Sequence, residues 1–312
     1  MDSFMVAVRV VLPMAAMIGI GMLLRIWKLA DGPMMKKVDV LIFNVFLPAM
    51  SFYNIYKTDF SQLHDVAFIL YAIVVVLILF STAMFLIPKL VHPRPTAAAF
   101  GQSLFRSNYL IFGAAVAQSI YGEGNFGLVS LLGAAVVPMY SSLSAILLEK
   151  ARHSSASPEK LLLSIAKNPT IVATFLGLAV NLCHLKLPEL VLDVVQDLSG
   201  LATPLSFLSI GVTLSLGSAV VKKVYLVSGI LLRLVVVPLI FVPIAVLLGF
   251  RGQQMCALMV MLVAPSAVSC YPMAVAMGAD GEYSAKIVAY TSLLCLPTIF
   301  LWTLLLSSMG LI

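Results

Sequence analysis

Three consecutive polar residues, Arg106, Ser107 and Asn108, lie inside a long apolar segment at about residues 97–121. A guanidinium and an amide both donate hydrogen bonds, and Ser107 and the neighbouring Tyr109 add hydroxyl groups. Polar groups are costly in an apolar setting and commonly mark a functional site. Two structural alternatives stay open: Arg106 reaches water near the end of the segment, or Asn108 bonds a neighbouring helix. A cluster of donors predicts a site for an anion.

A second apolar segment, about 254–278, carries Pro265 and Pro272 with Ser266 and Ser269 between them. Proline lacks an N–H and clashes with the preceding turn, so this pair predicts a broken helix, with a simple kink as the alternative. Broken backbone at membrane depth is tolerated where it is buried or lines a cavity. The free N–H groups at a half-helix N-terminus attract an anion. We therefore expect both segments to contribute to one anion site.

The two segments are related by a shift of 156 residues, half the length of the 312-residue chain. At this offset, residues that set helix geometry coincide: Pro13 with Pro169, Gly21 with Gly177, Pro48 with Pro204, Phe85 with Phe241, and Gly122 with Gly278. This symmetry predicts two copies of one unit, residues 1–156 and 157–312. Inverted repeats are typical of secondary transporters, which bind substrate where the repeats meet.

The composition is that of a membrane protein. Hydrophobic residues make up 62% of the chain and charged residues 10%, with a mean hydropathy of +1.09. A soluble domain carries about 25% charged residues, so we expect no soluble domain here. Since about 20 apolar residues span a bilayer, the sequence predicts an all-α protein with ten transmembrane helices: about 6–27, 37–56, 66–88, 97–121, 126–148, 168–185, 197–217, 224–249, 254–278 and 284–308.

The basic residues predict how these spans are oriented. If the first span ends in the cytoplasm at Arg25, twelve of the 19 Lys and Arg fall in inside loops and three in outside loops. This bias follows the positive-inside rule and predicts a plasma or inner membrane protein with both termini outside the cytoplasm. Basic residues that follow the first span also argue against a signal peptide. Because five spans is an odd number, the second repeat is predicted to be inverted.

The remaining composition points away from metals, cofactors and nucleic acid. The 4 Cys lie in apolar segments without paired spacing, and none of the 4 His has ligand spacing with another. We expect no cofactor, no metal and no enzyme, because intramembrane enzymes need a metal set, paired carboxylates or an activated serine. The net charge of +6 indicates contact with anionic lipid rather than nucleic acid. The expected partners are an organic anion, membrane lipid and, as a possible assembly, a homodimer.

Three motifs, in this order, resemble the auxin efflux carrier family: NVFLPAMSF in the second span, FRSNYLIFG followed by IYG in the fourth, and APSAVSCYPMAVAMGAD in the ninth. That family includes the plant PIN-formed auxin exporters and bacterial permeases for malate, malonate and similar acids. The resemblance covers the whole chain. It implies a scaffold part and a transport part, with helices four and nine broken and crossing at a proline-marked centre.

The resemblance also implies particular site residues. It places Asn108, and Pro265 with Ser266, opposite a carboxylate substrate, with Ser107, Tyr109, Ser269 and Pro272 as further candidates and Asn44 and Pro48 on the flank of the site. One position departs from the family pattern. Where the plant exporters have a proline seven residues after the Asn, this chain has Ala115. Span four is therefore expected to be less sharply broken than span nine.

No Asp or Glu lies deep in span four or nine; Glu123 and Asp280 lie just past their ends, and Asp39 lies near the start of span two. A carboxylate midway in a span would indicate a proton or cation relay. We therefore predict an exporter of small organic anions that works by alternating access of the elevator type. Its predicted mode is uniport driven by the membrane potential, worth about 2.3 kcal/mol per charge per 100 mV. A Na⁺- or H⁺-coupled symporter of the bile-acid-symporter type and an anion channel remain alternatives.

Overall fold

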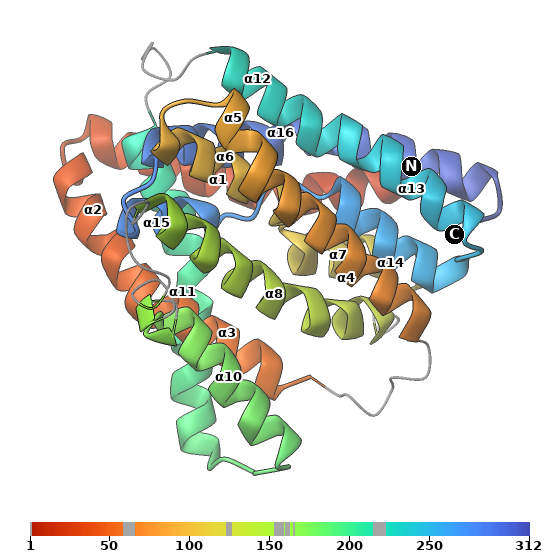
Figure 1. Cartoon of the computed structure of the whole chain (residues 1–312), viewed down its shortest axis with the longest axis horizontal. Helices are drawn as coiled ribbons and strands as arrows, with labels where there is room; N and C mark the ends of the chain where they lie inside the picture. The colour runs from red at the N-terminus through yellow and green to blue at the C-terminus, as the bar shows by residue number, and fades with distance from the viewer. Residues whose placement is uncertain are drawn as a thin grey trace.

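The computed structural model describes residues 2–58, 66–122, 127–152, 159, 163–164, 166–214 and 223–312, with side chains from residue 11 onward. Within these ranges the regular secondary structure is all helical, with short non-helical segments between the helices and no β-strand (Figure 1). The helices are α1 (Asp2–Ile26), α2 (Gly32–Leu41), η1 (Ile42–Phe46), α3 (Leu47–Tyr56), α4 (Val66–Ser81), η3 (Thr82–Leu86), α5 (Ile87–Leu90), α6 (Arg94–Phe105), α7 (Tyr109–Tyr121), α8 (Gly127–Arg152), α10 (Pro169–Leu182), α11 (Glu189–Thr213), α12 (Lys223–Leu231), η4 (Leu232–Val236), α13 (Val237–Leu247), α14 (Gly252–Val263), α15 (Cys270–Ala276) and α16 (Gly281–Ser308).

Five helical stretches are long and apolar enough to cross a membrane: Gly32–Tyr56, Val66–Leu90, Gly127–Arg152, Lys223–Leu247 and Gly281–Ser308. Each coincides with a predicted span. Shorter apolar helices fall in four further predicted spans: Val11–Ile26, Tyr109–Tyr121, Pro169–Leu182 and Gly252–Val263. The predicted seventh span corresponds to α11, which begins earlier than predicted, at Glu189, and carries Asp193 and Asp197 in its first turns. The all-α membrane architecture predicted from the sequence is confirmed at this level.

Three of the long stretches contain a π-helical turn just ahead of a proline. The turns η1, η3 and η4 end two residues before Pro48, Pro88 and Pro238, respectively. Proline removes one N–H and crowds the preceding turn, and a π-helical turn accommodates that crowding without ending the helix. These prolines therefore shape continuous helices, and the helices that stop inside the protein do so elsewhere.

Two glycine contacts join helices from opposite halves of the sequence. A Cβ atom on Gly21 of α1 would lie 2.3 Å from the carbonyl oxygen of Leu208 in α11. A Cβ atom on Gly177 of α10 would lie 2.9 Å from the carbonyl oxygen of Phe52 in α3. Small residues let membrane helices approach backbone to backbone. Together α1, α2, η1, α3, α10 and α11 form what we call the first helix group, of which α3, α10 and α11 lie side by side in Figure 1.

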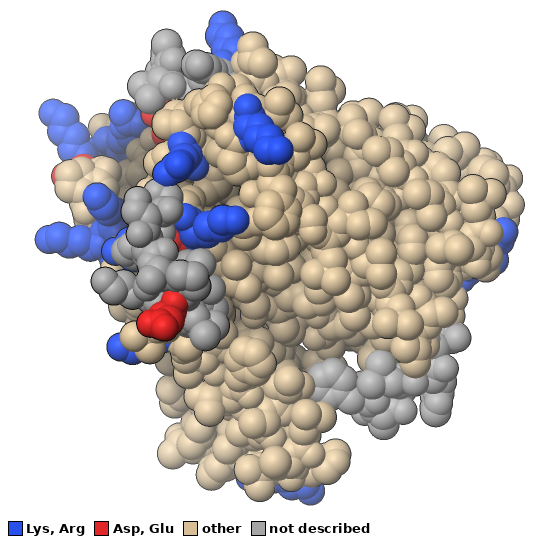
Figure 2. Space-filling model, in the orientation of Figure 1, with Lys and Arg blue, Asp and Glu red and all other residues tan. Residues whose placement is uncertain are grey.

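The second helix group consists of α4 to α8 and α12 to α16, including η3 and η4. The exposed side chains along its outer helices α4 and α12–α13 are large and apolar, for example Val74, Ile78, Val227 and Leu239. In contrast, Figure 2 shows most of the visible Lys and Arg side chains at one end of the molecule, over α2 and near α5 and α15. An apolar flank with a basic end suits a protein embedded in a bilayer.

Candidate functional site

Two helices of the second group are interrupted in the interior. Helix α6 ends at Phe105 and α7 begins at Tyr109, while α14 ends at Val263 and α15 begins at Cys270. Both interruptions fall in the segments that the sequence predicted to be broken. The first is three residues long and the second six. The shorter break is the one in span four, where Ala115 stands at the position of the family's proline.

The residues within the two breaks pair with each other through their backbones. The N–H of Asn108 donates to the carbonyl of Pro265 at 2.8 Å, and the N–H of Ala267 donates to the carbonyl of Arg106 at 3.0 Å. These two bonds form an isolated antiparallel bridge, so the segments run past each other in opposite directions. Buried backbone groups need partners, and each broken helix supplies them to the other.

Arg233, from η4, holds the ends of both broken helices. Its side chain is buried, and it donates from Nε and Nη2 to the carbonyl of Ala264 at 3.0 and 2.7 Å, from Nη2 to Met261 at 3.1 Å and from Nη1 to Leu104 at 3.2 Å. The last carbonyls of a helix lack partners and form the negative end of its dipole. Arg233 therefore satisfies the C-terminal ends of α6 and α14 together. Arg233 falls within the predicted span 224–249, and no local pattern in the sequence predicts this role.

A cavity of about 280 Å³ lies beside the breaks, between the two helix groups. The breaks contribute Arg106, Ser107, Asn108 and Ser269, and the first helix group contributes Asn54 and parts of α11. None of the lining residues is acidic. The cavity is therefore lined by hydrogen-bond donors and a cation, without a carboxylate to neutralise them.

Arg106 is buried at the cavity rather than directed to water. The residue is 3% exposed, and Nη1 lies 3.5 Å from the Tyr140 carbonyl and 3.2 Å from Sδ of Met273, while Nη2 lies 3.4 Å from Oγ of Ser141. These contacts are long or use a weak acceptor, and no carboxylate in the described chain pairs with the guanidinium. The alternative in which Arg106 reaches water near the end of the segment is wrong, because neighbouring helices cover it.

Asn108 and Ser107 each keep a polar atom without a partner. Nδ2 of Asn108 and Oγ of Ser107 are buried, line the cavity and have no hydrogen-bond partner among the described residues. Asn108 precedes α7, but its side chain makes no capping hydrogen bond to the helix. The first N–H groups of a helix lack intrahelical partners, so the N-terminus of α7 adds donors near the amide. Among the described residues, Asn108 makes no side-chain hydrogen bond to a neighbouring helix, contrary to the second alternative.

The other predicted site residues divide into two sets. Tyr109 and Ser269 line the cavity, and the hydroxyl of Tyr109 donates to the carbonyl of Val129 at 3.0 Å. Ser266 is fully buried and donates from Oγ to the carbonyl of Ser103 at 2.9 Å. Neither Ser266 nor Pro265 is part of the cavity lining. Both instead shape and tie the break that brings the lining residues together.

Three further predicted residues, Asn44, Pro48 and Pro272, are not part of the cavity lining. Pro272 is buried in the first turn of α15. Asn44 is exposed and bonds the carbonyl of Val40 in its own helix at 2.8 Å, and Pro48 follows the π-helical turn η1. The polar residue of this span that lines the cavity is Asn54, beside Leu47 and Met50, and it was not predicted from the sequence. Its signal was available, since an amide ten residues after Asn44 lies in the same apolar span.

A second cavity, of about 290 Å³, continues from the first. The two share Asn54, Leu110 and Val137 in their linings, and the second reaches Lys57 and Thr58 at the end of α3. The site at the breaks thus lies next to a cavity that reaches the end of the molecule carrying Lys57. In the described part of the chain, no cluster of His, Cys, Asp and Glu is suited to hold a metal ion.

Comparison with known proteins gives the family. The profile of a family described as membrane transport protein matches residues 6–303. The chain belongs to this family. The resemblance to the auxin efflux carrier family is thereby confirmed, and this membrane transport protein is a multi-pass transporter rather than an enzyme. It is also 23% identical over 308 residues to an uncharacterized transporter of Methanothermobacter thermautotrophicus, with 97% of this chain and 99% of that protein covered.

Proposed function

We propose that this membrane transport protein moves small organic anions, carboxylates in particular, and that the cavity at the two breaks binds them. The observation that carries the proposal is the convergence of Arg106 and Asn108 on one cavity that has no acidic residue in its lining. An anion is the ligand that balances this excess of donors and positive charge. A cavity of about 280 Å³ limits the ligand to a small molecule.

In this proposal, each hydrogen-bond donor of the cavity binds the carboxylate in a particular way. The guanidinium of Arg106 exchanges its long contacts to Tyr140 and Ser141 for two parallel bonds to a carboxylate, the geometry that suits a planar fork. The amide of Asn108, which has no partner at Nδ2, donates to the same group. Ser107 and Ser269 add hydroxyls. Arg233 keeps its carbonyl partners and only positions the breaks.

The transport cycle that we propose is alternating access of the elevator type, in a plasma or inner membrane. It uses ten spans arranged as two inverted five-helix repeats, 1–156 and 157–312, with both termini outside. The glycine contacts support this symmetry. Gly21 contacts Leu208, and Gly177 contacts Phe52. The two glycines are 156 residues apart in the sequence, and so are Phe52 and Leu208. The first helix group would act as the scaffold, since the cavity lies between it and the second group.

For the driving force, we propose uniport down the electrochemical gradient of the anion, which the membrane potential directs outward. The absence of acidic residues from the cavity lining supports this mode over a cation bound beside the substrate. The test is transport in proteoliposomes of a panel of dicarboxylates, amino-acid-derived acids and indole acids, with a potassium diffusion potential. At least one acid should move faster when the side corresponding to the cytoplasm is negative, without Na⁺. Transport that ignores the potential and requires Na⁺ or a pH gradient would refute uniport.

A further inference from the structure

Asp39 is a carboxylate in the interior that the proposed transport cycle does not use. The residue, in α2, is 0% exposed, and neither carboxylate oxygen has a hydrogen-bond partner among the described residues. The hydroxyls of Ser209 in α11 and Tyr271 in α15 face it without forming a hydrogen bond of normal geometry. Thr213 extends this group, with its Oγ1 2.9 Å from the Tyr271 hydroxyl. Although Asp39 lies near the start of a predicted span, α11 and α15 pack against α2 and cover it.

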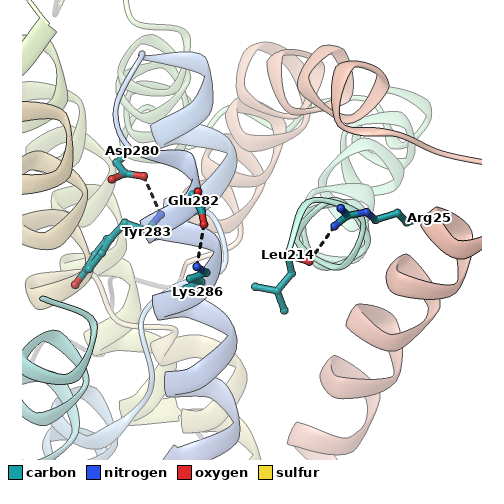
Figure 3. A network of polar contacts seen from close by, with 6 residues as sticks. All are labelled: Arg25, Leu214, Asp280, Glu282, Tyr283 and Lys286. Atoms are coloured by element: carbon teal, nitrogen blue, oxygen red, sulfur yellow. Dashed lines mark hydrogen bonds and ion pairs between the residues drawn. The ribbon is translucent and has the colours of Figure 1, made fainter. Parts of the chain in front are cut away.

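The charged groups around Asp39 are engaged elsewhere. On α16, Glu282 pairs with Lys286 at 2.8 Å, and at the end of α1, Arg25 donates to the carbonyl of Leu214 at 3.2 Å (Figure 3). Lys36, one turn before Asp39 in α2, is exposed. The groups that face Asp39 from α11 and α15 are hydroxyls. In the described chain, therefore, no cation forms an ion pair with this carboxylate, although Lys36 lines the same cavity.

Asp39 also has a route to the basic end of the molecule. A cavity of about 260 Å³ is lined by Asp39, Thr213, Tyr271, Lys36 and Glu282, among others. It is separate from the cavity at the breaks, because the two share no lining residue. Because both carboxylate oxygens are buried, an ion from the solvent at the end that carries Lys36 can enter this space but reaches the carboxylate only when the covering helices move.

A proton is the ion that fits this environment. A buried, unpaired carboxylate is strongly disfavoured, and such a group usually becomes neutral instead. Protonation removes the charge and supplies an O–H donor for the neighbouring hydroxyls. It requires no further ligands, whereas a metal cation needs several oxygen ligands. In the described part of the chain, no group of His, Cys, Asp and Glu around Asp39 could supply them.

The position of Asp39 connects the proton to movement. Asp39 and Ser209 belong to the first helix group, whereas Tyr271 lies on α15, directly after the break in span nine. We propose that Asp39 binds a proton while α15 packs over it and releases that proton to the end carrying Lys36 when the two groups part. The proton is then exchanged on one side only. Substrate flux stays driven by the potential, but its rate depends on the pH at that side.

The protonation of Asp39 can be tested without any transport assay. Infrared spectra of the purified protein in lipid should contain the C=O band of a protonated carboxylic acid that shifts in deuterium oxide. This band should be missing from Asp39→Asn and present in Asp193→Asn, a matched change at an exposed position in α11. Identical spectra for the wild type and Asp39→Asn would overturn the proposal. So would a gain in thermal stability with Na⁺ that Asp39→Asn alone fails to show.

The coupling to transport rests on the proposed function and needs a second measurement. With substrate and potential fixed, the pH on the side of Lys36 should change the wild-type rate, by no more than about tenfold per pH unit for one proton. Asp39→Asn should transport at a rate independent of that pH, and Asp39→Glu should restore the dependence. Equal pH dependence in the wild type and Asp39→Asn would overturn the coupling. Absence of organic anion transport in the wild type would instead refute the proposed function, leaving the infrared result to decide on the proton.

Discussion

Two buried arginines at the breaks, Arg106 and Arg233, differ in the hydrogen bonds that their guanidinium groups make. Arg233 makes four bonds of 2.7–3.2 Å to carbonyls at the ends of α6 and α14. Arg106 has only long or weak acceptors at 3.2–3.5 Å. A guanidinium that is fully bonded has little to offer a ligand, whereas one with long contacts can improve them. Arg233 therefore suits a structural role, and Arg106 suits a role in binding an anion.

The first prediction compares these two arginines. Arg106→Gln should fold with a near wild-type melting temperature but raise the half-saturation constant for the organic anion at least about tenfold, the effect of losing a charged hydrogen bond. Arg233→Gln should instead lower the melting temperature, because buried carbonyls at two helix ends lose their donor at about 1–3 kcal/mol each. Uptake kinetics and thermal unfolding check both. The reverse assignment of effects would contradict the division of roles.

The second prediction concerns the amide of Asn108. Asn108→Ala removes a donor that has no protein partner, so stability should change little while the half-saturation constant rises about tenfold or more. Asn44→Ala is the matched control, since that amide is exposed and bonds its own helix. Kinetics of uptake by both variants give the comparison. If the two variants have the same constants, Asn108 is a packing residue.

At the scale of the helix, the sequence predicted that two segments break but not which side chains meet in the cavity. Pro265 and the polar run from Arg106 mark the breaks because proline and buried polar groups disturb a helix. Serines in a broken segment look alike in the sequence, but their backbone conformations differ. Ser266 lies in the antiparallel bridge and bonds the backbone of Ser103, whereas Ser269 lies in the turn that leads into α15 and lines the cavity.

Other features depend on contacts far apart in the chain. The role of Arg233 arises only because the ends of two helices from different halves of the sequence come within reach of one side chain. The burial of Asp39 likewise depends on α11 and α15, which follow it by well over a hundred residues. Local pattern and hydropathy carry no such information. The sequence nonetheless placed Gly21 and Gly177 at equivalent positions, and both lie at close helix contacts.

The third prediction belongs to these helix contacts. Gly21→Val would place a Cβ atom 2.3 Å from a backbone oxygen of α11, so α1 and α11 must separate. We expect a loss of about 3 kcal/mol or more, at the upper end of overpacking effects. Gly19→Val, two residues earlier in the same helix with open space around its Cβ, is the control. Thermal unfolding in lipid measures both, and equal melting temperatures would show that the contact is not tight.

At the scale of the whole molecule, charge predicts orientation. Basic residues gather at one end in Figure 2, and the positive-inside rule assigns that end to the cytoplasm. The sequence positions 60 and 155, which lie in loops predicted to be outside and inside, fall beyond the described residues. Thr58 and Arg152, next to those loops, are described and serve equally well to test the orientation.

The fourth prediction is therefore made for these two residues. With the exposed Cys183 replaced by Ser, a cysteine at position 58 should react in intact cells with a reagent that cannot cross the membrane. A cysteine at position 152 should react only after the membrane is opened. The expected pattern follows from the excess of Lys and Arg in the inside loops. Labelling of position 152 in intact cells would show that the orientation, and with it the direction of transport, is the opposite of the predicted one.

The close approach of Gly21 to α11 also has a consequence for how the protein is made. Gly211 of α11, which packs against Gly21, follows it by 190 residues in the sequence. A Cβ atom on Gly211 would lie 2.1 Å from the carbonyl oxygen of Ile18. Ribosomes add about 5–20 residues per second, so α1 waits about 10–40 s in the membrane before its partner is synthesised. Until then lipid covers its glycine face. A nascent chain stalled before α11 should therefore hold α1 with α7 as a neighbour but with its glycine face still unpaired, and packing of the first half should finish only once the second half has been inserted.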